Sequence, residues 1–499
     1  MNVSMLLDMV SDSAPDRIAI GGRSSGLTFG DVQIRARRLA GILSRRGADR
    51  LGLIDLNSEA VPLCLYGAGI AGVPFAPVNY RLSDDQLRRM LERLAPALVV
   101  VGEGIAERCG SINGIEMIGR DELLAALASD DTPVLDEYPF VDPEDIAVLL
   151  FTSGTTGDPK AAVLRHRHLT AYILESVEFL GADEADAQLV SVPPYHIAGI
   201  SAVLSSTFSG RRIAYLPGFD AEDWVRTVVE QEVTQAMVVP TMLGRILDLA
   251  DQTGADLSRL RNLAYGGGRM PLELIKRAMA SLPQVQYVNA YGLTETSSTI
   301  SILGPDDHSE AMASDDPAVQ QRLCSVGRPL PAVEVEIRDP FGNPLPVGER
   351  GEIHVRGDQI SGEYLGESLL DSEGWFPTKD AGYLDEGGYL YLDGRLDDVI
   401  VRGAENLSPG EIEDVLLAHP AVADAAVFGV PDPEWGEAVA AVIVLDAGAD
   451  ATAEELQDHV RAQLRSTKTP QAIRFVDELP YNETGKLLRR VLRTDFADA

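Results

Sequence analysis

The feature that most constrains the fold is a series of short apolar runs separated by segments with a helical pattern. In the N-terminal part these runs cover 51–56, 72–79 and 97–102. Further runs cover 146–151, 189–195, 236–240, 262–268 and 286–292. Apolar strands that alternate with helices are typical of parallel sheets with both faces covered. The sequence therefore predicts a large N-terminal α/β body with parallel sheets.

One helix in this body has clear signals at both ends. Thr28 followed by Asp31 resembles a capping box, and apolar residues then recur at helical spacing. Gly47 stands where a helix of this length ends. We expect a helix between Thr28 and Gly47.

The pattern changes after residue 325. Segment 333–357 shows two-residue periodicity around turn signals, which predicts hairpins in a small β-barrel element. From about residue 396 a last unit mixes helix and strand patterns, as in α+β domains. The predicted architecture is a large body followed by a small C-terminal cap.

Composition excludes several classes of protein. The formal net charge of −35 argues against a nucleic-acid partner, since such binding depends on lysine and arginine contacts to phosphates. No apolar run is long enough for a membrane span, and the N-terminal residues lack the basic start of a secretory signal. Cys64, Cys109 and Cys324 are too far apart for a disulfide framework or a metal cluster. We expect a cytoplasmic protein.

The segment LLFTSGTTGDPKAAVLRH, residues 149–166, predicts an anion site. Gly154 and Gly157 let the backbone approach a ligand, and consecutive N–H groups can form an anion nest. Lys160, one of only five lysines, adds a compact positive charge. Hydroxyl donors come from Thr152, Ser153, Thr155 and Thr156. The spacing is not that of the P-loop, but a strand–loop–helix arrangement around these residues would still bind phosphate.

This loop resembles the signature loop of the adenylate-forming superfamily, which contains acyl-CoA synthetases, adenylation domains of peptide synthetases and firefly-type luciferases. Further motifs occur in the same order as in that family. They are PPYHIAG (193–199), YGGGRMP (265–271), YGLTET (291–296), the segment 374–413 that begins GWFPTKD, and NETGKLLRR (482–490). The resemblance therefore covers nearly the whole chain.

The resemblance implies an ATP-dependent acid–thiol ligase that works in two steps. A carboxylate attacks the α-phosphate of Mg-ATP and gives acyl-adenylate and pyrophosphate. The thiol of coenzyme A then takes the acyl group and releases AMP. Because one anion must approach another in the first step, catalysis should consist of charge neutralisation and positioning. The implied small molecules are a carboxylic acid, ATP, Mg²⁺ and coenzyme A, and a homodimer is compatible with the resemblance.

The motifs carry implied roles at the nucleotide. Tyr291 would stack on adenine, Thr294 would donate to the α-phosphate, and Glu295 would be a ligand of Mg²⁺. Asp380 would accept the ribose hydroxyls, with Arg395 bound to the same ribose. The backbone of Gly267, Gly268 and Arg269 would form the other wall around adenine. The remaining predicted ATP-binding residues are Thr152, Ser153, Gly154, Thr155, Thr156, Gly157, Lys160 and Gly292.

The resemblance also implies a cap that moves. It divides the chain into an adenylation domain (1–394), a hinge (395–398) and a C-terminal domain (399–499). Lys486 would bridge the attacking carboxylate and the α-phosphate, and is our first choice as a catalytic residue. After rotation about Asp397, Gly403 would line the path of the pantetheine thiol, because a glycine leaves that path open.

The acyl group is the least constrained part of this interpretation. His196 stands where acyl-CoA synthetases carry a histidine that gates the acyl pocket, and is a third catalytic candidate beside Lys486 and Thr294. No acid follows in YHIAGI, so a substrate without an α-amino group is expected. The candidate pocket residues indicate an aliphatic or aryl acid of moderate size. They are Ile200, Val239, Tyr265, Gly266 and Leu293.

Four positions differ from the usual family pattern. Ala161 and Lys379 stand where glycine is customary, and Arg269 and Ala404 where smaller or different residues are common.

Three other functions remain open. The main alternative is an acyl-AMP ligase that loads a carrier protein. The other two are a luciferase-like oxygenase and a nucleotide-binding protein without catalysis, although Lys486, Glu295 and Asp380 argue against the last.

Overall fold

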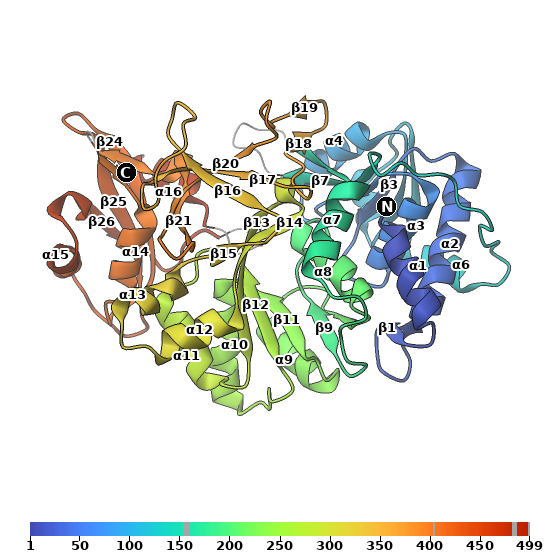
Figure 1. The fold of residues 1–499 in the computed structure, drawn as a ribbon, viewed down its shortest axis with the longest axis horizontal. Coiled ribbons are helices and arrows are strands. Elements are labelled where there is room, and N and C mark those ends of the chain that lie inside the picture. The colour runs from blue at the N-terminus through green and yellow to red at the C-terminus, as the bar shows by residue number, and fades with distance from the viewer. Residues whose placement is uncertain (153–159, 403–404, 482–486, 498–499) are drawn as a thin grey trace.

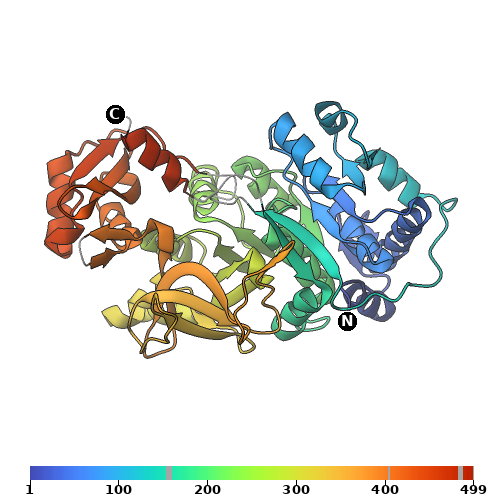
Figure 2. The same ribbon diagram turned by 90° about the horizontal axis from the view of Figure 1, so that it is seen from above.

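The structure is a computed structural model that describes residues 1–152, 160–402, 405–481 and 487–497 (Figure 1). Several predicted site residues lie outside these ranges: Ser153, Gly154, Thr155, Thr156, Gly157, Gly403 and Lys486. The N-terminal region of the body and the C-terminal cap lie at opposite ends of the molecule, and the view from above separates them clearly (Figure 2). No helix among the described residues has both the length and the apolarity needed to cross a membrane.

The N-terminal region is built on an eight-stranded sheet with the order β19-β18-β8-β7-β4-β3-β5-β6. Strands β7, β4, β3, β5 and β6 are parallel, whereas β8 pairs antiparallel with β7. In the order of the sheet, the strands are Glu367–Ser368, Glu363–Tyr364, Lys160–Arg165, Ile146–Thr152, Phe75–Pro77, Leu51–Ile54, Ala97–Val101 and Ile115–Gly119.

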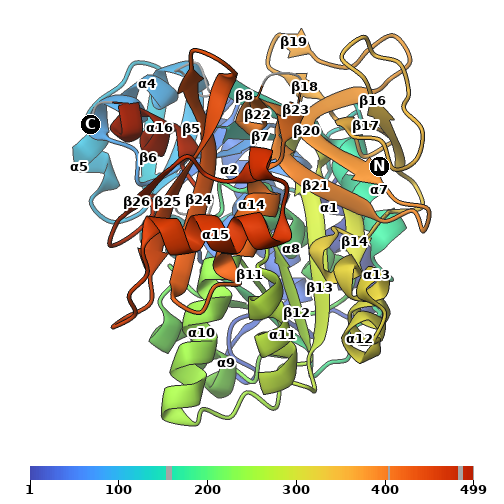
Figure 3. The same cartoon turned by 90° about the vertical axis from the view of Figure 1, so that its left-hand side faces the viewer.

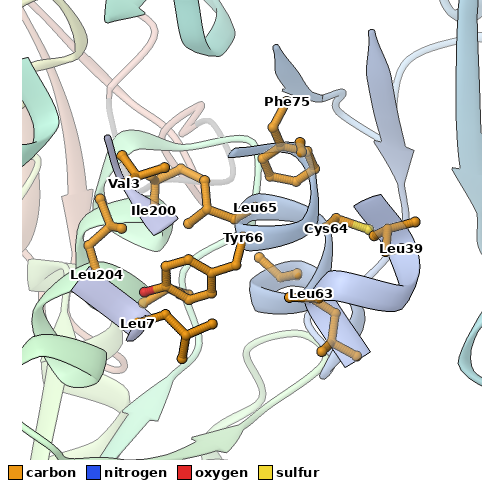
Figure 4. Close-up of a cluster of buried hydrophobic side chains, with 14 of the residues drawn as sticks. Val3, Leu7, Leu39, Leu63, Cys64, Leu65, Tyr66, Phe75, Ile200 and Leu204 are labelled. Carbon is orange, nitrogen blue, oxygen red and sulfur yellow. The ribbon is translucent and has the colours of Figure 1, made fainter. Parts of the chain in front are cut away.

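Helices cover both faces of this sheet. On one face lie α4 (Asp84–Leu94) and α5 (Ile105–Cys109). The other face packs on α1, α2, α3, α6, α7 and α8, which span Ser4–Ser13, Phe29–Arg46, Ala60–Ala71, Arg120–Ala128, His166–Ser176 and Ile197–Phe208. The same core includes Val190 and Ile213 of the second sheet, so it fills the space between the two sheets. Figure 4 shows part of this core around Tyr66.

The second sheet of the body has nine strands in the order β15-β14-β13-β12-β11-β9-β10-β1-β2. Strands β13, β12, β11, β9 and β10 are parallel, while β14 runs antiparallel to β13. In sheet order they span Arg328–Pro329, Ser298–Leu303, Gln286–Leu293, Asn262–Gly266, Gln235–Val238, Ala187–Val190, Arg212–Tyr215, Ile18–Ile20 and Leu27–Thr28. Its outer face packs on α9 (Ala221–Glu230), α10 (Pro240–Thr253) and α11 (Leu272–Ser281).

A four-stranded antiparallel sheet forms the small β element expected after residue 325. Its strands are β16 (Glu334–Arg338), β17 (Gly351–Arg356), β20 (Phe376–Leu384) and β21 (Leu390–Arg395). Its apolar side shares a core with Tyr291 and Ile300 of the nine-stranded sheet. The helices α12 (Pro305–Ala313) and α13 (Pro317–Gln320) and the short turn η2 (Gln321–Cys324) precede it.

The cap follows the short turn η3 (Leu396–Asp398) and has its own five-stranded sheet. The strands are β22 (Ile400–Arg402), β23 (Glu405–Leu407), β24 (Val422–Asp432), β25 (Gly436–Leu445) and β26 (Ala472–Phe475). Helices α14 (Pro409–Leu417) and α15 (Ala453–Gln463) cover one face, and α16 (Arg489–Ala497) covers the other. Figure 3 shows the cap from its outer side, with α15 in front of the sheet.

Local predictions agree well with these elements. Each apolar run of the body contains or overlaps a strand, and α2 has the expected capping box of Thr28 and Asp31. Gly47 ends α2 in the left-handed conformation. The sheets are mixed rather than purely parallel, because β2, β8 and β14 return antiparallel to their neighbours.

The segment after the glycine-rich loop corrects one prediction. We expected strand, loop and helix, but Lys160 begins strand β8, and α7 starts only at His166. Ala162, Val163 and Leu164 are completely buried in β8, which explains why this apolar stretch joins the sheet. The loop therefore connects two antiparallel strands, with Thr152 opposite Lys160, and no helix N-terminus follows it directly.

Candidate active site

Part of the predicted nucleotide site lies at the carboxyl ends of the parallel strands of the nine-stranded sheet. Strands β12 and β13 are parallel and in register, with Gly266 opposite Ala290. Beyond Gly266, β12 leads into the loop 267–269 beside the end of β13, and β13 continues to Leu293 and the turn 294–296. Val239 follows β11 and His196 follows β9 at the same end of the sheet. In open α/β sheets this end is where ligands bind.

The turn after β13 is held in a tight conformation. A side chain at Gly292 would place its Cβ 1.8 Å from the carbonyl oxygen of Ser298, so only glycine fits there. Ser297 and Ser298 both have positive φ angles, 55° and 112°. Non-glycine residues in such conformations store strain and are often found at functional sites. This turn carries Thr294, which is half-buried, and Glu295, which is buried.

Tyr291 and Arg395 hold the side chain of Asp380. The Tyr291 hydroxyl donates to Oδ2 of Asp380 at 2.6 Å, and Nε of Arg395 lies 3.1 Å from Oδ1. Asp380 on β20 is the register partner of Arg395 on β21. Burial, together with the Asp380 charge, raises the pKa of Tyr291 far above its ordinary value, so the phenol stays a donor. Each carboxylate oxygen has a second lone pair with which it can accept a further hydrogen bond.

The residue before Asp380 shows why a glycine is customary at that position. Lys379 has a φ of 60°, in the left-handed region, within an irregular stretch of β20. Its N–H donates to Oε1 of Glu352 at 3.2 Å, and its side chain is exposed. The backbone N–H of Asp380 donates to the Thr378 hydroxyl at 3.1 Å. The backbone shape thus directs Asp380 inward, and a lysine adopts it at a conformational cost.

Glu295 is anchored through both its backbone and its side chain. Its carbonyl oxygen accepts hydrogen bonds from the N–H groups of Ser361 and Gly362, both at 2.9 Å. The Tyr364 hydroxyl donates to the Glu295 carboxylate. Only 8% of Glu295 is exposed, so the carboxylate has a defined direction.

Lys160 contacts the ring of the same tyrosine. Its Nζ lies 5.1 Å from the centre of the Tyr364 ring and 2.9 Å from Oε2 of Glu367. Burial, and next the Glu295 charge, raises the pKa of Tyr364, whereas Thr152 and Arg395 lower it. Tyr364 therefore lies near residues that were predicted to bind the phosphates, the metal ion and the ribose.

Sequence reasoning did not identify Tyr364 or Glu367. Both belong to β18 and β19, a short hairpin at the edge of the eight-stranded sheet. The pair Tyr364–Ala162 joins this hairpin to β8, directly beside Lys160. Nothing in the local pattern of residues 363–368 indicates a site, because the partners lie 69 and 207 positions away.

His196 has a structural role that is compatible with a pocket position. It is the N-cap of α8, and its Nδ1 accepts a hydrogen bond from the Ala198 N–H at 3.2 Å. Burial lowers its pKa to about 4, so the imidazole is neutral near pH 7.

A cavity of about 410 Å³ lies where body and cap meet. Val239 lines it, together with Tyr80 and Arg81 of the body and the cap segment 478–481. Other predicted acyl-pocket residues lie elsewhere. Ile200 is completely buried in the core with Val3 and Leu204 (Figure 4).

Tyr265 is also completely buried, and its hydroxyl is hydrogen-bonded to Nε2 of His308 at 2.8 Å. Gly266 is buried at the end of β12, and Leu293 is half-buried at the end of β13. These contacts give Tyr265 a structural role in the body and leave the extent of the acyl pocket a prediction.

Two further histidines, His166 and His168, are buried in the body. His166 and His168 on α7 are 0% and 1% exposed, and burial lowers their pKa values to about 4 and about 3. Nδ1 of His166 accepts from the Val3 N–H at 3.3 Å, and Nδ1 of His168 accepts from the Arg165 N–H at 3.2 Å. Both therefore support the fold as neutral groups.

The fold and the site together define a nucleotide-binding enzyme with a body that carries the polar site and a cap that closes one side of it. The family model of the AMP-binding enzyme matches residues 7–365, and that of the AMP-binding enzyme C-terminal domain matches residues 411–486. The chain belongs to the family of AMP-binding enzymes.

Known relatives match over nearly their whole lengths. The 2-succinylbenzoate–CoA ligase of Bacillus licheniformis is 33% identical over 97% of this chain and 98% of its own. The fatty acid–[acyl-carrier-protein] ligase ScoC of Streptomyces coeruleorubidus is 31% identical over 94% and 92%.

The o-succinylbenzoate CoA synthetase MenE of Bacillus subtilis has a similar solved structure. With the acyl-adenylate OSB-AMP it gives a TM-score of 0.82 at 28% identity, over 98% of this chain and 97% of that chain. With ATP and magnesium ion the TM-score is 0.81 at 28% identity, over 97% and 98%.

Proposed function

We propose that this enzyme forms an acyl-adenylate from a carboxylic acid and Mg-ATP and then transfers the acyl group to coenzyme A with release of AMP. The observation that carries the proposal is the convergence on Tyr364. Lys160, Glu295 and, through its charge, Arg395 all act on this one side chain. A lysine, a directed carboxylate and a ribose-binding pair are the groups that a bound nucleoside triphosphate needs.

The residues of the site fit Mg²⁺ that arrives with the nucleotide. Among the described residues, no group of three or more histidine, cysteine or acidic side chains could hold a metal ion. Mg²⁺ commonly uses one or two carboxylates and completes its shell with substrate phosphates and water. Glu295 supplies one such carboxylate, and Tyr364 directs it. The ion would supply positive charge at the phosphates.

In the first half-reaction this chain's own groups position the reactants. Asp380 accepts the ribose hydroxyls, while Tyr291 and Arg395 keep the carboxylate in place. Lys160 exchanges its contact with Glu367 for one with a phosphate oxygen, since both partners are anionic and the lysine side chain is flexible. Thr294 donates to the α-phosphate from its position beside Glu295.

The cap supplies the remaining positive charge. Lys486 bridges the acid and the α-phosphate in this proposal, as the family motif implies. Residues 478–481, which precede it in the sequence, line the cavity together with Val239 of the body. For the second half-reaction the cap turns about Asp397 in η3, and Gly403 borders the path of the thiol.

A second acceptor is favoured by one comparison. The relative ScoC is named for transfer to an acyl carrier protein, and it matches over most of both chains. Both acceptors present the same pantetheine thiol, so the adenylation site would be the same. The acceptors differ in what they require of the surface of the cap.

Two assays separate these proposals. Pyrophosphate release is measured with 2-succinylbenzoate, ferulate and palmitate, which sample a dicarboxylic aryl acid, a monocarboxylic aryl acid and a long aliphatic acid. AMP release is then measured with coenzyme A, with a holo acyl carrier protein and with neither. We expect acid-dependent pyrophosphate release and a thioester with coenzyme A. A thioester on the carrier protein alone would select the second acceptor, and ATP binding without acid-dependent release would reject both.

A further inference from the structure

One contact between body and cap involves a residue with no assigned side-chain role. The Arg269 guanidinium donates to the carboxylate of Asp414, and the two residues are 145 positions apart. Arg269 follows Gly267 and Gly268 in the loop after β12, and Asp414 lies on α14 of the cap. About a third of each side chain is exposed, 36% and 31%, so the ion pair is partly shielded from water.

The same guanidinium contacts the backbone of α14. A Cβ atom built at Gly410 would lie 1.7 Å from Nη1 of Arg269 and 2.9 Å from its Cζ. No other residue type fits at position 410 while Arg269 keeps this position. Arg269 is thus packed on the first turn of α14 as well as paired with Asp414. A second link, the Ser408 hydroxyl to the Asp393 carbonyl at 3.0 Å, lies just before the same helix.

This contact belongs to one orientation of the cap. The cap residues 478–481, which lead to Lys486 in the sequence, line the cavity shared with the body. Strand β22 precedes Gly403 in the sequence and contains Val401 and Arg402, and Arg402 lies over the ring of Trp435. Val401 and Trp435 are about half exposed, at 50% and 47%. The end of the cap that precedes Lys486 therefore faces the body, and the end that precedes Gly403 faces solvent.

We propose that Arg269 is a positioning residue that holds the cap in the orientation for acyl-adenylate formation. The inference rests on the proposed two-step function. Any large rotation about η3 moves α14 away from the loop 267–269, so the Arg269–Asp414 pair opens before the thiol step. A side chain without a long cationic group at position 269 could not reach Asp414. Because the backbone of this loop is also a predicted wall of the adenine site, nucleotide binding and cap position share one loop.

The test compares the two half-reactions in matched variants. Acid-dependent exchange of pyrophosphate into ATP measures the first step, with 2-succinylbenzoate, ferulate or palmitate, whichever is fastest. Thioester formation from the synthetic adenylate of that acid and coenzyme A measures the second. Arg269→Ala is expected to lower exchange roughly tenfold, by depopulating the competent orientation, and to leave the second step within about twofold. Equal losses in both steps, or unchanged exchange, would overturn the proposal.

Gly410→Ala provides an independent variant of the same contact. The added methyl group displaces the Arg269 guanidinium, so exchange falls as in Arg269→Ala, although alanine favours helix formation. Because both changes remove one contact, the double variant should be no slower than Arg269→Ala alone. Additive losses would contradict the shared contact. Arg277→Ala is the matched control, since Arg277 pairs with Asp248 and Asp251 within the body and should leave both steps unchanged.

A distance measurement tests the orientation without turnover. Spin labels are placed at Gln252→Cys on α10 and Glu454→Cys on α15, both exposed, with Cys324→Ser because Cys64 and Cys109 are buried. We expect one main distance in the labelled parent and a broader distribution after Arg269→Ala. An unchanged distribution would overturn the inference even if the enzyme is active. Absence of exchange with every acid in the parent enzyme, with the distribution still broadened, would reject the proposed function and leave the contact established.

Discussion

The body and the cap are held in different ways. In the body, Tyr291 and Arg395 hold the carboxylate of Asp380, and Glu295 is bound at its backbone and its carboxylate. These groups belong to strands and turns that share one apolar core. The cap has its own core, and α14 meets the body through the polar pairs Arg269–Asp414 and Ser408–Asp393.

This difference suggests a division of labour. Apolar cores bind their elements permanently, because separating them exposes surface to water. A few polar contacts at a partly exposed interface are nearly balanced by hydration, so they can exchange. The body should therefore fix the nucleotide in both half-reactions, whereas the cap should contribute different groups to each. Changes at the nucleotide-binding residues of the body should therefore affect both half-reactions, and changes in the cap should affect mainly one.

The largest expected effect lies in the cap. Lys486→Ala should lower acid-dependent pyrophosphate exchange by roughly 10²–10³, since loss of one preorganised donor at the reacting phosphate costs ~3–4 kcal/mol. Thioester formation from preformed acyl-adenylate should continue. Exchange at the rate of the unmodified enzyme would remove Lys486 from the mechanism and weaken the comparison at its strongest point.

The next effect lies in the body. Asp380→Ala should lower kcat/KM for ATP by about 10², because hydrogen bonds from the two ribose hydroxyls to a charged group contribute at least ~1.5 kcal/mol each. Thioester formation from acyl-adenylate should fall as well, since the adenylate carries the same ribose. The control Tyr291→Phe removes one hydrogen bond to Asp380 and should cost only roughly three- to tenfold. A loss confined to one half-reaction would break the division between body and cap.

The body should also be sensitive to acid. His166 and His168 have pKa values of about 4 and about 3 in the fold, below the ordinary 6.5. Between these values and 6.5 the unfolded chain binds more protons, so the free energy of unfolding is highest above pH 6.5 and falls as the pH drops. The loss from pH 7 to pH 5 should be on the order of 1–2 kcal/mol per histidine.

His168→Gln separates this effect from packing. Glutamine can keep the hydrogen bond at the third helical position of α7, where His168 accepts from Arg165, but it does not titrate. Denaturant unfolding at several pH values should show a shallower acid dependence for the variant. The same slope in both proteins would show that His168 does not contribute.

The smallest effect concerns the backbone beside Asp380. Lys379 adopts a φ of 60°, which glycine tolerates at lower cost, so Lys379→Gly should raise the free energy of unfolding by about 0.5–1 kcal/mol. The exposed side chain has no expected part in catalysis, and kcat should stay unchanged. Lys379→Val should destabilise the protein, because a β-branched residue fits this conformation poorly. Thermal unfolding and a steady-state assay measure both results.

Many of the elements could be predicted because their signals are local. The apolar runs marked the strands of the body, and Thr28, Asp31 and Gly47 marked the ends of α2. The strand formed by residues 160–165 was not predicted, because its formation depends on another part of the chain. The stretch AAVLR suits a short strand or the start of a helix, and only pairing with β7 selected the strand.

Some residues of the site could be predicted from the sequence and others could not. The motif residues Tyr291, Glu295, Asp380 and Arg395 were predicted from a resemblance that carries the outcome of pairing in other proteins. Tyr364 and Glu367 were missed because a tyrosine and a glutamate in a short hairpin carry no local signal of their partners.

The sequence by itself determined which segments become strands and helices, since hydrophobic periodicity and capping act over a few residues. It also determined the chemical groups available at each turn. Only the tertiary structure decided which turns lie together, because the order of strands in a sheet and the packing of a cap join residues far apart in the chain. The contact of Tyr291 with Asp380, 89 positions away, and that of Arg269 with Asp414 exist for this reason.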